Sequence, residues 1–497
     1  MKFVLQKNTL IYVSCGGLLM LILGVILGYK IFPKIVEKKV WEQAVLANNT
    51  QQWELFKKLP FPFTFKVYIF NVDNPEGILL GEKPKVTEKG PFVYDAYHWK
   101  TDISWNDDEI SFFEWTRFEF NAGKSGKWSD NDEITVLNAA YNGLFITVEE
   151  LSPSALEGIS SVTEGVFGEY DNLFMKIKVK DYLFGGYPIC VNPGDKGFLV
   201  GTICGQMKAK VGKGLRMDGN RILAAQMYHK NMTHLGRFTV NSGLKVKEKV
   251  STLVKYNSKP HIETWRGGNE SDCNKIRGVV TFPPFIRKDM KFDTFGEDIC
   301  RMMTLSYNST EKVKGIPGYK FTAMNDSFET VDKKAENLCY CVNRSRTLDG
   351  SFSCLRNGLL DLTTCIGTQV ILSFPHLMHA DQSYLDSVIG LLPNSSLHET
   401  FVTLEPITGT PLRLAKRVQF NMFLRAIEGV SVIENLTNSL LPLFWIEEGL
   451  ELPDPFTDMI KKELLRKLFI LDILKYTMIV MGIAAVVVPG FLLIYMR

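Results

Sequence analysis

The sequence predicts an α+β membrane protein in which two transmembrane helices, one near each end of the chain, flank a large β-rich domain. Three observations point to this class. An uncharged apolar run lies near each end, the residues between these runs alternate in polarity in several segments, and all eight Asn-x-Ser/Thr motifs lie between the runs. A chain of 497 residues that is 45% apolar can bury a large core. The net charge of +3 gives no indication of a nucleic-acid partner.

The first apolar run, residues 10–29, carries no charged side chain. At about 1.5 Å per residue it is long enough to cross the roughly 30 Å core of a bilayer. The alternative is a cleaved signal peptide, since Lys2 and Lys7 precede the run. The run is longer than a typical signal core, however, and no small-x-small cleavage motif follows it before Lys30. We therefore predict an uncleaved anchor, with residues 1–9 as a cytoplasmic tail.

The second apolar run, residues 476–495, contains Pro489, which a transmembrane helix tolerates. Two spans place both termini on one side of the membrane, with residues 496–497 as a second cytoplasmic tail and residues 30–475 on the other side. Basic residues flank both spans on the side of this long segment, but long segments translocate largely regardless of charge. The Asn-x-Ser/Thr motifs instead favour a glycosylated, lumenal or extracellular ectodomain. They begin at Asn48, Asn231, Asn269, Asn308, Asn325, Asn343, Asn394 and Asn435.

The ectodomain carries eight cysteines, and a ninth, Cys15, lies in the first span. An even number of cysteines in an oxidising compartment indicates disulfide bonds. Zinc sites usually need pairs spaced C-x₂₋₄-C, whereas the closest pair here is C-x-C and no histidine lies within residues 338–365. Disulfides are therefore favoured over a metal, although spacing alone does not choose among the connectivities. The eight residues are Cys190, Cys204, Cys273, Cys300, Cys339, Cys341, Cys354 and Cys365.

Between the spans, local patterns predict a mixture of strands and helices. Residues 32–59 begin with a proline near the start and continue at near-helical spacing, which predicts a helix rising from the membrane. Residues 63–70, 110–120 and 412–422 alternate in polarity and predict strands with one buried face. Ser152-Pro153 is a helix-start signal, after which apolar residues to Phe167 recur at three-to-four spacing. Residues 171–184 are ambiguous between helix and strand.

The sequence predicts no catalytic residue, no metal ligand and no cofactor. His376 and His379, or His229 and His234, could each contact a metal, but no cysteine or carboxylate completes a set, so structural histidines are favoured. Acidic clusters at residues 107–109 and 130–133 lack the ligand spacing of an EF-hand. Nucleotide and hydrolase motifs are also missing from the sequence. This pattern favours a receptor or carrier over an enzyme.

Seven segments, taken in order along the chain, form a specific set. They are LPFPFTFKVYIFNVDNPEGI (59–78), KGPFVY (89–94), DICR (298–301), CYC (339–341), SFPHL (373–377), EPITGTPLRLAKRVQFN (405–421) and LPLFWIEEG (441–449). This set resembles the class B scavenger receptors, the family of fatty acid translocase and lysosomal integral membrane protein type 2. The resemblance covers essentially the whole chain and is closest to the insect sensory neuron membrane proteins, most of all their second type. It implies an antiparallel β-barrel-like ectodomain with a helical cap at about residues 150–185 and an apolar tunnel toward the membrane.

The resemblance also implies bonds, ligands and partners. It implies disulfides Cys273–Cys339, Cys300–Cys365 and Cys341–Cys354, and it leaves Cys190 and Cys204 open between two buried thiols and a fourth bond. The implied ligand is a long-chain lipid, either a fatty acid or a fatty-acid-derived odorant or pheromone. The receptor would lie in the plasma membrane and deliver this ligand to the membrane or to a co-receptor. An odorant receptor or a soluble odorant carrier would be its partner.

The cap differs from that of scavenger-type receptors in its charged residues, and an alternative function has to be considered. Glu164, Glu169 and Asp171 are predicted to face ligand there, where scavenger-type receptors carry lysines. Acidic groups would repel anionic particles within a Debye length of roughly 8 Å, which argues against lipoprotein scavenging. The alternative function is a protein-binding sorting or adhesion receptor of the lysosomal or scavenger type. A channel subunit fits less well because the first span offers few polar positions to line a pore. An ectonucleotidase also fits less well, because glycine-rich phosphate loops are missing from the sequence.

Overall fold

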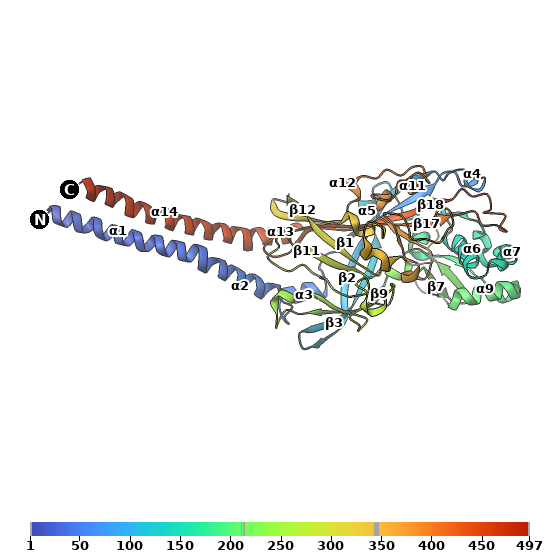
Figure 1. Ribbon diagram of the computed structural model, residues 1–497. Coiled ribbons are helices and arrows are strands. Elements are labelled where there is room, and N and C mark those ends of the chain that lie inside the picture. The colour runs from blue at the N-terminus through green and yellow to red at the C-terminus, as the bar shows by residue number, and fades with distance from the viewer. Residues whose placement is uncertain (1, 210, 212–213, 342–346, 496–497) are drawn as a thin grey trace.

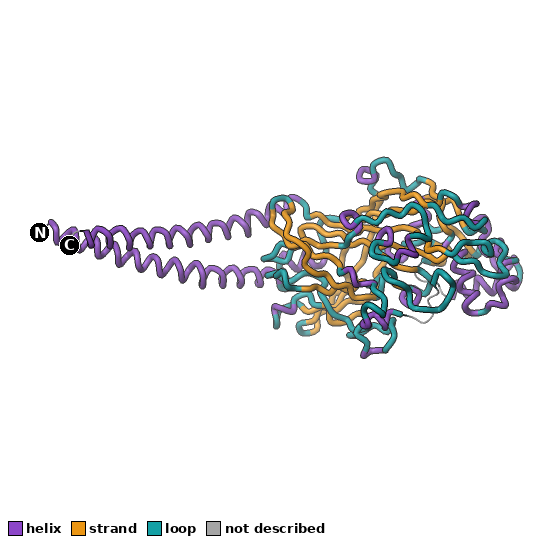
Figure 2. The backbone as a smooth tube through the Cα atoms, turned by 45° about the horizontal axis from the view of Figure 1, so that its top comes forward, coloured by secondary structure: helices purple, strands orange, loops and turns teal. Residues whose placement is uncertain are grey.

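The computed structural model describes residues 2–209, 211, 214–341 and 347–495. Two long helices run side by side from the chain termini and carry an elongated ectodomain at their other end (Figure 1). The strands gather in the middle of this ectodomain, and short helices lie at the end farthest from the termini (Figure 2). The prediction of two terminal apolar helices flanking a large, mainly antiparallel domain is therefore confirmed.

The terminal helices α1 (Lys2–Ile26) and α14 (Arg466–Tyr495) are both long and apolar enough to cross a membrane. They approach each other closely because small residues lie between them. A Cβ atom on Gly17 would lie 2.7 Å from Ala485 Cβ, and one on Gly482 would lie 2.7 Å from the backbone nitrogen of Leu21. The helices continue toward the ectodomain as η1 (Leu27–Ile31) and α2 (Phe32–Ala44), and as η12 (Ile460–Leu465) and α13 (Asp454–Met459).

The prediction of one helix over residues 32–59 is wrong in its middle part. Helix α2 ends at Ala44, and a second helix, α3 (Gln51–Lys57), starts only after Thr50, whose side chain accepts a hydrogen bond from the Trp53 N–H. The chain leaves the helical path because Leu46 is fully buried in the ectodomain and its N–H donates to the carbonyl of Ser242, 2.9 Å away. A tertiary contact thus overrides the local periodicity.

The ectodomain is built on an antiparallel sheet of 13 strands. Its main path runs in the order β10-β9-β3-β2-β1-β18-β17-β16-β13-β12-β11, with β15 attached to β17 and β14 attached to β15. The three segments predicted as strands lie within β1, β3 and β17. The strands are β1 (Phe63–Val72), β2 (Val86–Asn106), β3 (Glu109–Phe120), β9 (Thr233–Asn241), β10 (Leu253–Tyr256), β11 (Lys291–Gly296), β12 (Arg301–Val313), β13 (Ile316–Ala323), β14 (Leu360–Asp361), β15 (Ile371–Ser373), β16 (Phe401–Leu404), β17 (Pro411–Leu424) and β18 (Ser439–Glu451).

A short connecting segment, residues 278–280, closes this sheet into a barrel by joining its two end strands. On one side, the Leu253 N–H at β10 donates to the carbonyl of Gly278, and the Val280 N–H donates to the carbonyl of Ser251. On the other side, the Val279 N–H donates to the carbonyl of Asp293 in β11, 2.9 Å away. Both edges of the sheet are therefore covered at this level, and the barrel acquires a defined interior.

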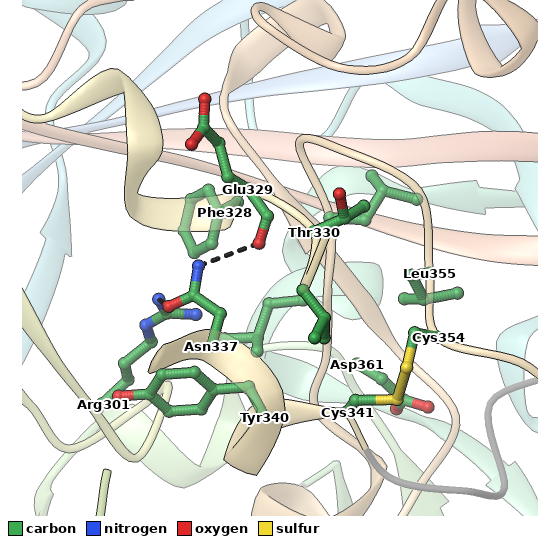
Figure 3. Close-up of a pocket in the computed structure, with 13 residues that line it drawn as sticks. Arg301, Phe328, Glu329, Thr330, Asn337, Tyr340, Cys341, Cys354, Leu355 and Asp361 are labelled. Carbon is green, nitrogen blue, oxygen red and sulfur yellow. Dashed lines mark hydrogen bonds between the residues drawn. A yellow bond between two sulfur atoms is a disulfide. The ribbon is translucent and has the colours of Figure 1, made fainter. Parts of the chain in front are cut away.

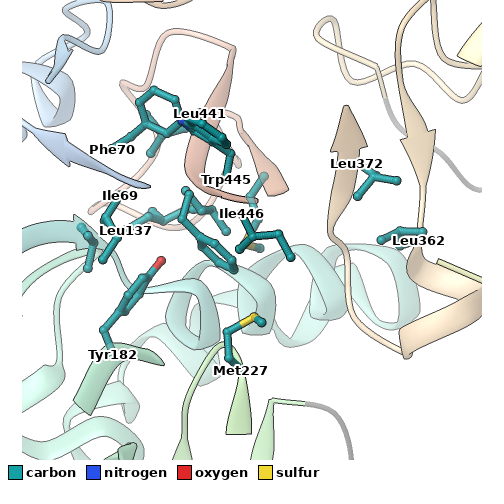
Figure 4. Packing of buried hydrophobic residues seen from close by; sticks show 14 of the residues in the cluster. Ile69, Phe70, Leu137, Tyr182, Met227, Leu362, Leu372, Leu441, Trp445 and Ile446 are labelled. Carbon is teal, nitrogen blue, oxygen red and sulfur yellow. The ribbon is translucent and has the colours of Figure 1, made fainter. Parts of the chain in front are cut away.

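Alternate residues of each strand face that interior. In β1, Phe65, Val67 and Ile69 are at most 1% exposed, whereas Lys66 and Tyr68 lie on the outer face beneath the loop of residues 374–400. Near the cap the interior is filled by a large hydrophobic core, in which residues of β1 and β18 belong to one cluster with Leu137, Tyr182 and Met227 (Figure 4).

The helical cap is larger than the predicted span of residues 150–185. It contains α6 (Ala139–Leu151), α7 (Leu156–Ser160), α8 (Thr163–Phe167) and α9 (Phe198–Ala209), which lie at the end opposite the termini (Figure 1). The segment at residues 171–184, ambiguous in sequence, contains both a strand and a helical turn, β5 (Phe174–Lys178) and η4 (Asp181–Gly185).

The remaining short elements connect or support the barrel and the cap. Strand β5 pairs with β4 (Glu133–Leu137), and a further small sheet has the order β6-β8-β7. These strands and the short helices are β6 (Tyr187–Ile189), β7 (Leu215–Asp218), β8 (Arg221–Ala224), α4 (Pro75–Leu79), α5 (Ala122–Ser125), α10 (Thr363–Ile366), α11 (Gln382–Leu385) and α12 (Ser395–His398).

The closing segment predicts the effect of a single methyl group at Gly278. This residue has a φ of +96°, and a Cβ atom there would lie 2.2 Å from the carbonyl oxygen of Asp293. We expect Gly278→Ala to destabilise the folded state by about 2 kcal/mol or more, because it combines backbone strain with a clash at the barrel seam. The measurement is thermal unfolding of the detergent-solubilised full chain.

Gly315→Ala is the matched control for this experiment. Gly315 has a similar φ of +84°, but an added Cβ atom would meet nothing within 4 Å. It should therefore cost only the backbone strain, about 1 kcal/mol. Equal losses of Tm in the two variants would show that the seam contact at Gly278 contributes nothing beyond backbone strain.

Candidate functional site in the barrel interior

Charged side chains occupy the membrane-proximal part of the barrel interior. Paired residues of neighbouring antiparallel strands place their side chains on the same face of the sheet. Phe65 is buried on the inner face of β1 and pairs with Glu448 of β18, which in turn pairs with Lys416 of β17. Glu448 and Lys416 therefore lie on the inner face as well. This level is close to the membrane because β18 leads directly into α13 and the second terminal helix.

Two further charged residues, Lys230 and Asp298, lie near Lys416 and come from distant parts of the chain. Asp298, in the turn between β11 and β12, forms an ion pair with Lys230, which precedes β9. The same carboxylate oxygen of Asp298 lies 3.9 Å from Lys416 Nζ. Strands β9 and β17 are five steps apart in the sheet order, so these three side chains meet across the interior rather than along the sheet.

A second group lies beside the first on β2, β3 and β18. His98 Nε2 is 3.3 Å from Glu448, and His98 Nδ1 is 3.8 Å from Glu114. Lys100 Nζ is 3.1 Å from the other oxygen of Glu114 and also lies over the Phe56 and Phe112 rings. The interior thus holds a chain of opposite charges. We refer to these residues together as the interior charge cluster. Its members are His98, Lys100, Glu114, Lys230, Glu297, Asp298, Lys416 and Glu448.

Electrostatics keep most of this cluster ionised. Burial alone would raise the pKa of Asp298, but Lys230 and Lys416 hold it far below its ordinary value. Burial would likewise lower the pKa of Lys416, yet Asp298, Glu297 and Glu448 raise it above its ordinary value. Glu297 is the exception, since burial and the charge of Asp298 raise the pKa of its carboxyl group. Glu297 is therefore the acid of the cluster that is protonated most easily.

The cluster surrounds space that water can reach. The side chains of Lys416, Glu114 and Glu448 remain 38%, 32% and 23% accessible, although all three lie on the inner face of the closed barrel. Accessible surface at such positions belongs to an interior chamber or its mouth, not to the outer surface of the sheet. We call this space the polar chamber.

Aromatic side chains form the wall of the interior between the polar chamber and the cap. Phe118 packs on Phe65 and on Phe184 of the cap, with ring centroids 4.6 and 5.4 Å apart. Phe420, four residues beyond Lys416 on β17, packs on Phe444. Phe118, Phe184 and Phe420 are only partly buried. The interior is therefore charged at the level of Lys416 and Glu448 and apolar from there toward the cap, while a continuous tunnel through the described residues remains a prediction.

A pocket on the outer side of the barrel is a weaker candidate. Arg301, Asn337, Tyr340 and the Cys341–Cys354 disulfide line it (Figure 3). The Arg301 guanidinium already lies 3.7 Å from the Tyr340 ring centroid and donates to the carbonyl of Ser327 and the side-chain oxygen of Asn337. The charge of Arg301 is thus used within the protein, which is the arrangement expected of a structural element.

The cysteines form four disulfide bonds. Three join the pairs implied by the resemblance, Cys273–Cys339, Cys300–Cys365 and Cys341–Cys354. The fourth, Cys190–Cys204, which the sequence left open, ties the chain after β6 to helix α9 of the cap. Cys15, in the first terminal helix, is free. The bonds thus support the cap and the loops, and the Cys300–Cys365 bond lies beside Asp298, whose carbonyl oxygen is 3.7 Å from Cys365 Sγ.

The predicted cap residues lie at the other end of the ectodomain from the polar chamber. Glu164 and Glu169 are exposed on α8 and the turn after it, and Asp171 is half-buried. Lys196 and Lys208 are exposed at the start and end of the neighbouring α9 region, so the cap presents both signs of charge. Its electrostatic effect on a ligand is therefore weaker than residues 164–171 alone suggest.

The histidine pairs singled out in the sequence do not come together as sites. His376 Nε2 lies 2.7 Å from Glu88 on the outer face, and its Nδ1 accepts from the Leu392 N–H. His379 packs instead against Phe374, and His234 packs against Phe113 and Trp115. These contacts give His376, His379 and His234 structural roles. His229 lies close enough to Asp298 to help lower the pKa of that carboxyl group.

The glycosylation motifs differ in accessibility. Asn231 is half-buried, and its side-chain oxygen accepts a hydrogen bond from the Phe118 N–H. It is therefore the least suited of the described motifs to carry a glycan. Asn343 lies outside the described residues. The six exposed asparagines are Asn48, Asn269, Asn308, Asn325, Asn394 and Asn435.

Comparison with known proteins places this architecture in a family. The CD36 family model matches residues 15–493. Sensory neuron membrane protein 2 of Anopheles gambiae is 32% identical over 97% of this chain and 92% of its own length, and that of Aedes aegypti is 32% identical over 89% and 92%. Sensory neuron membrane protein 1 of Apis mellifera is 32% identical over 94% of this chain and 88% of its own length.

The His98–Glu448 pair predicts a pH-dependent contribution to stability. Burial would lower the pKa of His98, but Glu448 and Glu114 raise it, so its contribution is complete below the ordinary value of 6.5 and is lost as pH rises through the raised pKa. Burial would raise the pKa of Glu448, but His98, Lys416 and Lys230 lower it from 4.5 to about 2, so its contribution is complete above 4.5. The pair should therefore stabilise the fold most between these two ordinary values.

A double-mutant cycle of His98→Gln and Glu448→Gln tests this expectation. Thermal unfolding of the full chain should give a coupling of about 1–2 kcal/mol near pH 5.5 and much less near pH 9. The exposed pair Arg117–Glu119, 2.9 Å apart, is the control and should show weak coupling at both pH values. A His98–Glu448 coupling that is the same at both pH values would contradict the assignment.

Proposed function

The chain belongs to the CD36 family and is a membrane receptor of the scavenger type. From that membership we propose that it binds fatty acids or fatty-acid-derived odorants and pheromones outside the cell and passes them through its ectodomain to the membrane or to a co-receptor. The relatives at about one-third identity are named sensory neuron membrane proteins, which supports a role in chemosensation.

One observation carries the proposal: the closed barrel has an interior that is accessible near the membrane and lined by aromatic residues toward the cap. A long-chain ligand is poorly soluble, and each methylene that leaves water contributes about 0.8 kcal/mol. A protein that moves such a ligand needs an apolar path with a polar end. Phe118 and Phe420 on one side and Lys416 with Glu448 on the other provide groups of both kinds within one interior.

The orientation and the partners follow from this proposal. The receptor lies in the plasma membrane with both termini in the cytoplasm, and its ectodomain, residues 30–475, carries glycans at the exposed asparagines. Its partners are a long-chain lipid, the membrane itself, and an odorant receptor or a soluble odorant carrier. It acts without a catalytic step, a cofactor or a nucleic-acid partner.

A second candidate function, a protein-binding sorting or adhesion receptor, is favoured by the surface of the cap. Phe198 at the start of α9 is 90% exposed, and Leu151 at the end of α6 is 69% exposed. Large apolar side chains exposed at one end of an ectodomain are typical of protein contact sites. Phe198→Ser should abolish cell adhesion or cargo binding under this alternative, and it should leave lipid binding intact under the first proposal.

Blocking the interior tests the lipid-binding proposal. Leu414 lies on the inner face of β17 beside Lys416 and is partly accessible. Leu414→Trp adds a large ring to the interior, so binding of a photoactivatable long-chain fatty acid by the full chain in nanodiscs should fall about tenfold or more. Crosslinked peptides identified by mass spectrometry would report where the probe lies.

Arg413→Trp is the matched control for this substitution. Arg413 is the preceding residue on the same strand, but it is exposed on the outer face. It should leave binding within about twofold of the wild type, since it places the same ring outside the barrel. Absence of saturable binding in the wild-type protein, or equal binding by both variants, would reject the interior as the ligand path.

A further inference from the structure

Lys416 differs from its neighbours on the inner face of β17. The flanking positions on that face, Leu414, Val418 and Phe420, are all apolar. A lysine in such a row has to place its ammonium group where something solvates or neutralises it. Lys416 does so in the polar chamber, where 38% of its side chain remains accessible.

The carboxylates near Lys416 are engaged more closely by other cations. Asp298 approaches Lys230 more closely than Lys416, whose Nζ is 3.9 Å away. Glu448 faces His98 at 3.3 Å, and Glu114 faces Lys100 at 3.1 Å. Within the described residues, Lys416 Nζ donates no hydrogen bond. Its ion pair with Asp298 is the longest of these contacts.

The pairing of opposite charges within the interior charge cluster also singles out Lys416. Lys230 is balanced by Asp298, Lys100 by Glu114, and His98 in its protonated form by Glu448. Lys416 and Glu297 remain, and no ion pair joins these two residues within the part of the chain that the structure describes. Among these cations, Lys416 is the one whose nearest carboxylate oxygen is the most distant, at 3.9 Å.

The surroundings of Lys416 match one end of an amphiphile. At the level of Lys416, the polar chamber is accessible to water, and Glu448 and Asp298 line it. On the cap side, Val418 and Phe420 extend the same face by about 13 Å at 3.3 Å per residue, and Phe420 packs on Phe444. A ligand with an anionic head at Lys416 would thus lay its tail toward the cap.

We propose that Lys416 Nζ binds the anionic head group of a single-tailed lipid, a carboxylate or a phosphate monoester, inside the barrel. The two sources of such a head group are a free fatty acid and a lipid phosphate. This assignment rests on the proposed lipid-binding function and makes it specific: the receptor prefers anionic lipids to neutral ones of equal chain length. The preference comes from an interior lysine, whereas the cap presents both signs of charge.

The experiment compares three probes that share a hexadecyl chain: palmitate, hexadecyl phosphate and hexadecanol. Binding to the full chain in nanodiscs is measured against empty nanodiscs. The wild-type protein should bind at least one anionic probe about tenfold more tightly than hexadecanol, the effect of one charge-assisted hydrogen bond in a partly buried site. The better of the two anionic probes identifies the head-group source.

Lys416→Gln should abolish the preference for the anionic probes and leave hexadecanol binding unchanged. Lys416→Arg should retain the preference, which shows that the positive charge and not the side-chain length is needed. Arg413→Gln removes a cation from the outer face of the same strand and should change none of the three affinities. Thermal unfolding of each variant checks that the fold is intact.

The outcomes separate this inference from the proposed function. Equal affinity of the wild-type protein for all three probes would overturn the role of Lys416 while leaving lipid binding in place. Parallel losses for hexadecanol and palmitate in Lys416→Gln would also overturn it, because they indicate a structural role. Failure of the wild-type protein to bind any probe above empty nanodiscs would reject both the assignment and the proposed function.

Discussion

The rest of the ectodomain depends on the closure of the sheet between β10 and β11. Residues 278–280 satisfy backbone groups of both end strands, so neither edge is left open for pairing with another chain at this level. Closure also separates an inner from an outer face on every strand. It brings Lys230, Asp298 and Lys416 to one point although their strands lie far apart in the sheet. Without this seam there would be a curved sheet, but no interior in which charges and aromatic rings could face a ligand.

The same strands carry a second set of charges on their outer face, and this set has a different role. Arg417 and Glu447 form a close pair to which Lys66 contributes a third charge, 2.7 Å from Glu447. Arg417 also donates to the carbonyl of Glu399, which holds the loop of residues 374–400 over the outer surface. These outer groups are closely paired and fix the loop. Among the inner groups, Lys416, Glu114 and Glu448 remain partly accessible, which is the arrangement that a binding site requires.

The polarity of the side chains that line the interior changes along the barrel axis. Charged groups desolvated inside a protein are costly unless they are paired or meet a ligand. Here the interior charge cluster lies at the level of Lys416, and Phe118, Phe184 and Phe420 continue the wall toward the cap. A lipid with one polar end matches such a gradient in a single orientation. The cap, in contrast, exposes acidic and basic side chains together with Phe198.

The sequence by itself determined the two membrane helices, the strands β1, β3 and β17 and the disulfide-bonded character of the domain. These follow from local properties, namely the length of an apolar run, alternation with a period of two, and an even number of cysteines. The break in the helix after Ala44 could not be predicted, because the burial of Leu46 and its bond to Ser242 are tertiary. Lys416 did give a local signal, a charge within the apolar register of β17, but the pattern assigns only a face of the strand. What lies opposite that face was decided by the closure of the barrel, because only closure brings Asp298 and Lys230 from distant segments against it.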